Sequence, residues 1–136
     1  MADKIIAVDF DGTLCEACWP AIGAPKEAVI RYVMEQQKQG AKLILWTNRC
    51  GEYLDNAVRW CKEHGIEFDA VNENLPQMIK AFGNDCRKVY ADEYIDDKAT
   101  PVVEIEVKSK RPLRRRTARV RVAQYLHEPA PQNSGE

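Results

Sequence analysis

Two aspartates follow an apolar segment close to the amino terminus. Residues 5–8 read IIAV, which is typical of a buried parallel strand, and Asp9 and Asp11 come after them. Gly12 and Thr13 predict a turn at the carboxyl end of this strand, the edge at which open α/β sheets bind ligands. One carboxylate there could attack phosphorus while the other transfers a proton. The spacing therefore indicates an aspartyl-phosphate active site.

Short apolar segments alternate with amphipathic ones through most of the chain, as they do in α/β proteins with a parallel sheet and flanking helices. The pattern predicts strands at residues 5–9, 43–46, 66–71 and 89–95. It predicts one helix from near Pro25 to Gly40 and another from Pro76 to Phe82. Between them, the spacing of Leu54, Ala57, Val58 and Cys61 predicts a helix that ends near Gly65. These elements must bring the chemically active residues together.

Polar residues also follow two later strands of the predicted sheet. Thr47, Asn48 and Arg49 come after the second strand, and Asp96 and Asp97 come after the last one. Because the carboxyl ends of parallel strands meet at one edge, we expect all of these residues to lie beside the first two aspartates.

Three segments in this order, DFDGT at 9–13, LILWT at 43–47 and YIDD at 94–97, resemble the phosphatases of the haloacid dehalogenase-like superfamily. The resemblance spans about residues 4–99. It implies a three-layer Rossmann-like parallel sheet with flanking helices. Residues 14–25 are too few for an inserted cap domain, so we expect a capless member.

The resemblance and the residue chemistry assign the same roles. Asp9 is expected to be the nucleophile, and Asp11 to protonate the leaving group and later deprotonate water. Thr47 is expected to donate a hydrogen bond to a phosphoryl oxygen, and the loop amides at Gly12 and Thr13 to bind the phosphate as well.

Two carboxylates facing a phosphate dianion require a neutralising cation, and hard oxygen ligands favour Mg²⁺. The resemblance implies that Asp9, the backbone carbonyl of Asp11 and Asp96 bind this ion. Asp97 is expected to act through water or to orient its neighbours.

A basic residue should also neutralise the phosphate, and the sequence leaves its identity open. Lys80 is a candidate because it lies about one turn into a helix that begins near the catalytic edge. Arg49, next to Thr47, is a candidate phosphate contact, and Asn48 either contacts substrate or caps the turn. A strand of about seven residues, at about 3.3 Å per residue, would place Lys88 over 20 Å from the catalytic edge, which makes it a poor candidate.

Other polar residues have structural interpretations. Cys15 and Cys18 are expected to be small loop residues, because no second pair completes a four-ligand metal site. Asn72 and Asn74 are expected to shape the loop before Pro76. Asp92 is interpreted either as a buried, satisfied carboxylate or as a further site residue.

The carboxyl-terminal segment lies outside the resemblance. We expect a catalytic domain at 1–100, a basic β-hairpin-like extension at 101–126 and a disordered tail at 127–136. Residues 108–121 hold eight basic and no acidic residues, and six of them lie close together: Lys108, Lys110, Arg111, Arg114, Arg115 and Arg116. They could pair with glutamates across the hairpin, mediate oligomerisation or bind nucleic acid nonspecifically.

Composition fits a soluble chain. The 136 residues are 45% hydrophobic, no apolar segment is long enough to span a membrane, and five cysteines are an odd number for a disulfide framework. We therefore expect a cytoplasmic location and no membrane partner.

The sequence thus predicts a capless, Mg²⁺-dependent phosphomonoester hydrolase acting on a phosphorylated small molecule or a nucleotide. One alternative is a nucleotide or polynucleotide-end phosphatase guided by the basic segment. The other is a binding or regulatory protein that keeps the fold but has little activity. The sequence names neither the substrate nor the oligomeric state.

Overall fold

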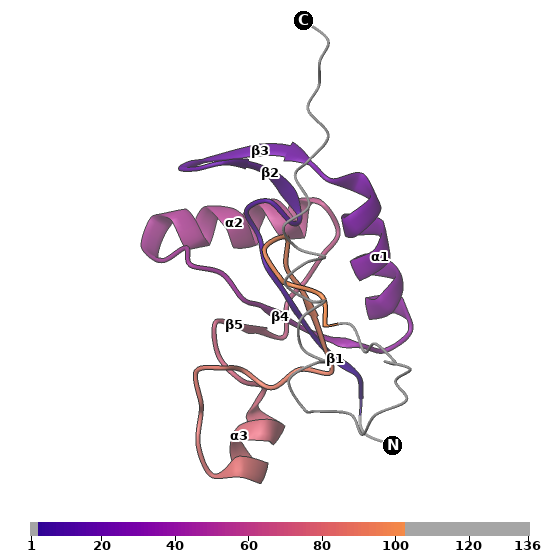
Figure 1. The fold of residues 1–136 in the computed structure, drawn as a ribbon, viewed down its shortest axis with the longest axis vertical. Coiled ribbons are helices and arrows are strands. Elements are labelled where there is room, and N and C mark those ends of the chain that lie inside the picture. Colours follow the sequence, from indigo (N-terminus) through magenta and orange to yellow (C-terminus); the bar gives the residue numbers. More distant parts are fainter. Residues whose placement is uncertain (1–2, 103–136) are drawn as a thin grey trace, which may run out of the picture. The chain divides into compact units, whose positions relative to one another are not determined.

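A computed structural model describes residues 3–102 of the chain (Figure 1). Almost all of the predicted extension at 101–126, and all of the predicted tail at 127–136, lie outside the described residues. The helices and strands belong to one compact unit, Met1–Asp97. In chain order they are β1 (Ile5–Val8), β2 (Cys15–Cys18), β3 (Ala21–Pro25), α1 (Glu27–Lys38), β4 (Lys42–Leu45), α2 (Gly51–Glu63), β5 (Ala70–Val71), α3 (Pro76–Phe82) and β6 (Glu93–Ile95).

Four strands form a parallel sheet in the order β5-β4-β1-β6. In the central strand, Val8 pairs with Leu45 of β4 on one side and with Ile95 of β6 on the other. The architecture is therefore α/β, with a parallel sheet flanked by helices as predicted, and the strand order is compatible with a Rossmann-like fold. The register brings the carboxyl ends of β1, β4 and β6 together.

The side chains of β1 alternate between two apolar layers. Ile6 and Val8 belong to the cluster that includes residues of α1 and α2, whereas Ile5 and Ala7 belong to a second cluster that α3 joins through Met78. All four strand residues are buried. Because both faces of the strand are covered, its sequence reads as a continuous apolar run rather than as an alternation.

Residues between β1 and α1 differ from the prediction, because they form an antiparallel hairpin of β2 and β3 (Figure 1). Cys15 and Cys18 are strand residues rather than loop residues, and Pro25 pairs with Cys15 instead of opening the helix. Helix α1 begins two residues later, at Glu27. At Gly23, a Cβ atom would overlap the backbone of Glu16, so close contact between the strands requires glycine.

The predicted strand at 89–95 is shorter in the structure, where β6 covers only Glu93–Ile95. Val89 is buried, but the backbone of this segment bonds largely to side chains. The N–H of Tyr90 donates to Asn74 Oδ1 at 2.7 Å, and the Tyr94 hydroxyl donates to the Val89 carbonyl at 2.6 Å. Val89 and Ala91 are therefore buried without belonging to a strand of the sheet.

This difference affects two sequence interpretations. The distance argument against Lys88 assumed a seven-residue strand, and that assumption is wrong because β6 has three residues. The Nζ atom of Lys88 lies 5.1 Å from the ring centre of Tyr94. Asp92 is exposed and accepts the N–H of Ile5, so it is neither buried nor at the catalytic edge. It instead anchors the beginning of β1.

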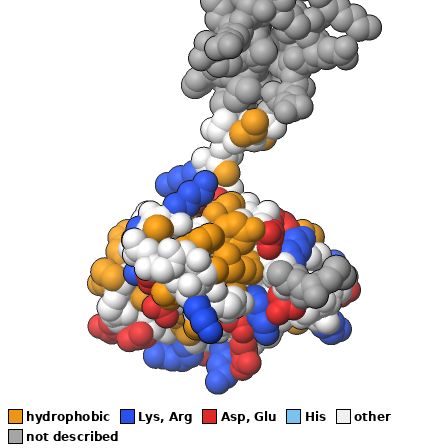
Figure 2. Space-filling view, turned by 90° about the horizontal axis from the view of Figure 1, so that it is seen from below, with side chains coloured by type: hydrophobic (Ala, Val, Ile, Leu, Met, Phe, Trp, Pro, Cys, Tyr) orange, Lys and Arg blue, Asp and Glu red, His pale blue; other side chains and the backbone are white. Residues whose placement is uncertain are grey.

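The surface carries both apolar and charged areas. Figure 2 shows hydrophobic side chains gathered on the face seen from below, with acidic and basic side chains near them. Among the residues that the structure describes, no helix combines the length and apolar character needed to cross a membrane.

Cysteine reactivity gives a test of the fold. Cys15 and Cys61 are buried, and burial raises the pKa of Cys61 to about 12, whereas Cys18, Cys50 and Cys86 are exposed. We predict that a thiol reagent at neutral pH modifies these three exposed cysteines quickly and the other two only after unfolding. Peptide mapping of modified cysteines checks this. Fast modification of Cys61 in the folded protein would contradict the described core.

Candidate active site

The carboxyl ends of the strands form a cleft of about 350 Å³. Asp9 follows β1, Thr47 and Asn48 follow β4, and Asp96 follows β6, so the structure brings these four predicted site residues together. Among residues 3–102, the cleft is lined by Asp9, Trp46, Thr47, Asn48, Asn72, Arg87 and Asp96. A cavity of this size suits a phosphate group with part of a small substrate.

Asp9, Asp96 and Asp97 form an acidic cluster beside the cleft. One carboxylate oxygen from each lies within 4.8 Å of the others. Carboxylate oxygens are the ligands that Mg²⁺ prefers, and their spacing fits a shared divalent ion. The side chain of Asp11 does not belong to the cluster. The backbone carbonyl of Asp11 as a metal ligand, which the resemblance implies, stays a prediction.

Thr13 forms hydrogen bonds with two members of this cluster, Asp9 and Asp97. Its buried hydroxyl donates to Asp9 Oδ2 at 2.9 Å, lies 3.2 Å from Asp97 Oδ1 and accepts the backbone N–H of Asp97 at 2.9 Å. The N–H of Thr13 itself donates to the carbonyl of Phe10. Thr13 therefore orients the acidic residues, and its amide is not directed to a phosphate as we had expected.

The N–H and the carbonyl of Gly12 both form hydrogen bonds within the protein. Its N–H donates to the carbonyl of Cys15, and its own carbonyl accepts Lys26 Nζ at 2.8 Å. Its φ of +85° favours glycine, and a Cβ atom would overlap the carboxylate of Asp97. The role of Gly12 here is close packing, rather than the phosphate binding that the sequence suggested.

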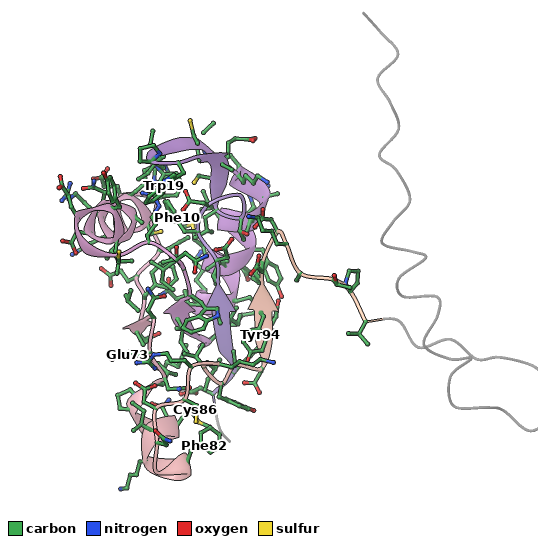
Figure 3. The ribbon with its side chains drawn as sticks, turned by 60° about the vertical axis from the view of Figure 1, so that its left-hand side comes forward. Phe10, Trp19, Glu73, Phe82, Cys86 and Tyr94 are labelled. Atoms are coloured by element: carbon green, nitrogen blue, oxygen red, sulfur yellow. The ribbon has the colours of Figure 1, made fainter. Side chains whose placement is uncertain are left out.

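Arg49 has a different partner from the phosphate we expected. Its Nε and Nη2 each donate to one oxygen of Asp11 at 2.8 Å, and Nη2 also donates to the carbonyl of Ala21 in β3. Arg49 is only 2% exposed, and its Cζ atom lies 5.0 Å from the ring centres of both Phe10 and Trp19, two residues near the β2–β3 hairpin in Figure 3. The hydrogen bond to Asp11 raises the pKa of Arg49.

The two other basic candidates also differ from expectation. Lys80 is exposed in the last turn of α3 and does not line the cleft. Arg87 does line it, although sequence reasoning passed over this residue. Arg87 is next to Lys88 in the sequence, but the predicted long strand excluded Lys88 from the catalytic edge, and Arg87 was not considered.

The asparagines before α3 shape the loop, in agreement with the sequence interpretation. Asn72 adopts a φ of +54°, and its Oδ1 accepts the N–H of Thr47 at 2.8 Å. Asn74 is 2% exposed and donates to Asp85 and to the carbonyl of Cys86. Asn72 additionally lines the cleft.

The acidic environment alters the ionisation of the predicted nucleophile. The pKa of Asp9 is raised from 3.8 to about 6, chiefly by burial and also by the neighbouring Asp97 and Asp96 carboxylates, while the Thr13 hydrogen bond acts in the opposite direction. A divalent cation would favour the ionised form that the surrounding protein disfavours.

Comparison with solved structures finds a protein that resembles this chain over most of its length. A conserved protein from Bacteroides thetaiotaomicron is 40% identical, and the match covers 72% of this chain and 78% of that one with a TM-score of 0.63. No protein-family model matches the chain. No curated protein matches it either.

We predict that Mg²⁺ stabilises the protein in a pH-dependent way. Because the pKa of Asp9 is raised in the folded protein, its protonated form stabilises the metal-free protein, and this stabilisation is lost as pH rises through about 6. Metal binding, in contrast, requires the ionised carboxylate. The rise in Tm on adding Mg²⁺ should therefore be full at about pH 7.5 and shrink below about pH 6. Thermal unfolding with and without Mg²⁺ measures this, and a pH-independent shift would refute it.

We predict that Thr13→Val weakens both the fold and the metal site. The change removes the hydroxyl that binds Asp9 and leaves the N–H of Asp97 without its partner, which should lower the free energy of unfolding by about 1–3 kcal/mol. Thr13→Ser keeps the hydroxyl and is the matched control. Denaturant unfolding and the Mg²⁺-induced Tm shift should both separate the two variants; equal behaviour would contradict the bridging role.

Proposed function

We propose that this chain, which belongs to the same family as the conserved protein from Bacteroides thetaiotaomicron, is a Mg²⁺-dependent phosphomonoester hydrolase of the haloacid dehalogenase-like type. The observation that carries the proposal is the position of Asp9. It follows the central strand, belongs to an acidic cluster and shares a cleft with Thr47 and Asn48. Few sites need a carboxylate nucleophile, a metal-binding cluster and a hydroxyl donor in one cleft, and phosphoryl transfer is one of them.

The reaction we propose has two displacements. Oδ2 of Asp9 accepts the Thr13 hydrogen bond, so Oδ1 is the oxygen that attacks phosphorus while the ester P–O bond breaks. Asp11 enters the cycle protonated and gives this proton to the departing alkoxide. Water then attacks the phosphorus of the aspartyl phosphate, Asp11 accepts a proton from it, and phosphate leaves with Asp9 regenerated. Thr47 is the donor to a phosphoryl oxygen.

Asp11 must change partners during this cycle. Both of its oxygens accept hydrogen bonds from Arg49, so reaching the leaving group requires one of these bonds to be exchanged for a bond to the ester oxygen. Arg49 also donates to the carbonyl of Ala21 in β3. It therefore acts as a positioning residue that links the acid–base group to the β2–β3 hairpin.

The metal would be held by Asp9, Asp96 and Asp97. When bound, Mg²⁺ neutralises negative charge on the phosphoryl oxygens and on the acidic cluster. Thr13 keeps Asp9 and Asp97 in register for that role.

The cleft supports a phosphorylated small molecule or a nucleotide as substrate. Its lining holds one aromatic residue, Trp46, and two amides, Asn48 and Asn72, beside the carboxylates. The polynucleotide-end alternative relies on residues 108–121, which lie outside the described residues, and stays a sequence prediction together with the cytoplasmic location.

Hydrolysis of p-nitrophenyl phosphate tests the proposal. We predict turnover with Mg²⁺, none with EDTA, and a loss of at least about 10³-fold in kcat for Asp9→Asn, because the amide cannot form an acyl phosphate. Asp55→Asn changes an exposed aspartate on α2 and is the matched control, expected to retain activity. Equal activity in wild type and Asp9→Asn would reject the nucleophile. A wild-type protein that binds Mg²⁺ but hydrolyses no phosphomonoester would favour the binding-protein alternative.

A further inference from the structure

We propose that Arg87 is the side chain that binds the phosphoryl oxygens of the substrate, oriented for this task by Asp85. The inference rests on the proposed function, because it completes the phosphate site of the same cleft. Arg87 was not a candidate in the sequence analysis. We assign to it the neutralisation of the phosphate, for which Lys80 and Arg49 were the candidates.

Charge balance in the cleft requires such a residue. Asp9 and Asp96 contribute negative charge to the lining, and a phosphate monoester brings more. Among the residues that line the cleft, Arg87 is the basic one. A guanidinium matches the geometry of two phosphoryl oxygens, which makes arginine well suited to this contact.

The hydrogen bonds of Arg87 to Asp85 leave the Nε–Nη2 edge of its guanidinium available to bind a phosphate. Nη1 donates to Asp85 Oδ1 at 2.7 Å and to the Asp85 carbonyl at 3.3 Å. Within residues 3–102, Nε and Nη2 of Arg87 donate to no protein atom. Arg49 uses this same Nε–Nη2 edge to bind both oxygens of Asp11, which shows the fork geometry with a carboxylate in place of phosphate.

Asp85 is itself held by a buried residue. The backbone N–H and Nδ2 of Asn74 donate to Asp85 Oδ1 at 3.1 and 2.8 Å, and Asn74 Oδ1 accepts the N–H of Tyr90. The Arg87 guanidinium and then Asn74 lower the pKa of Asp85 to about 2, so this anchor stays ionised at neutral pH. A continuous set of contacts therefore runs from a buried amide to the guanidinium at the cleft.

Other basic side chains near the site have different positions. Arg49 is buried against Asp11, and Lys26 donates to the carbonyl of Gly12. Lys80 is exposed on α3, which lies at the end of the unit opposite the β2–β3 hairpin (Figures 1 and 3). Lys88 places its Nζ 5.1 Å from the ring centre of Tyr94 and does not line the cleft. Within the described part of the chain, these contacts and positions leave Arg87 as the cation of the cleft lining.

Orthovanadate, a phosphate analogue, tests the inference independently of turnover. Isothermal titration calorimetry of the Mg²⁺-loaded full-length protein should show that Arg87→Ala weakens orthovanadate binding about tenfold or more, with only partial retention in Arg87→Lys, which lacks the fork. Lys80→Ala is the matched control and should stay within about twofold of wild type. Asp85→Asn should weaken binding by a smaller factor.

Two further measurements distinguish a role in phosphate binding from a general loss of folding or of the metal site. The Mg²⁺-induced Tm shift should be unchanged in Arg87→Ala, and added guanidinium ion should restore orthovanadate binding to Arg87→Ala. Orthovanadate affinity of Arg87→Ala within about twofold of wild type would overturn the inference, as would a wild-type protein that binds no orthovanadate. Arg87-dependent binding without hydrolysis of p-nitrophenyl phosphate would uphold it while the phosphatase proposal failed.

Discussion

The hydroxyl of Thr13 links the ends of two strands that carry the acidic cluster. It donates to Asp9 after β1 and accepts the backbone N–H of Asp97 after β6. Two carboxylates would otherwise repel each other across this short distance, and Gly12 must lack a side chain for the turn to lie against Asp97. The parallel register of β1 and β6 brings the strand ends together, and Thr13 converts that proximity into a fixed geometry. The cleft and the proposed metal site both depend on this one buried group.

A second polar connection joins the catalytic loop to the hairpin. Arg49 binds Asp11 through two hydrogen bonds and Ala21 through a third, while its guanidinium lies near the rings of Phe10 and Trp19. Burying this cation is tolerable because it is paired, whereas removing its carboxylate partner would leave an uncompensated charge. The pairing also means that the proposed acid–base residue and the hairpin are coupled. Movement of the hairpin would therefore affect how readily Asp11 turns to a substrate.

Sequence patterns predicted the parts of the fold that depend on local periodicity. The apolar run of β1, the amphipathic face of α2 and the Pro76–Phe82 helix are all present. The β2–β3 hairpin was missed because Gly23 and its neighbours carry neither a clear alternation nor a typical two-residue turn. The strand at 89–95 was overestimated because burial of Val89 comes with backbone bonds to side chains such as Asn74. Site residues at strand ends were predictable, but the partner of Arg49 and the position of Arg87 depend on distant segments and therefore required the structure.

The central claim is that Asp9 becomes phosphorylated during turnover, and trapping that species tests it most directly. The Asp11→Asn variant lacks the base for the second displacement, and p-nitrophenolate leaves without a proton, so the intermediate should accumulate. We would mix this variant with Mg²⁺ and p-nitrophenyl phosphate, quench in acid and map the peptides by mass spectrometry. The account predicts one added HPO₃ group, located on Asp9. Because this change removes the carboxylate partner of Arg49, circular dichroism must first show that the variant is folded. Release of p-nitrophenol by wild-type protein with no phosphorylated Asp9 in the folded, quenched variant, or with the group on another residue, would contradict the account.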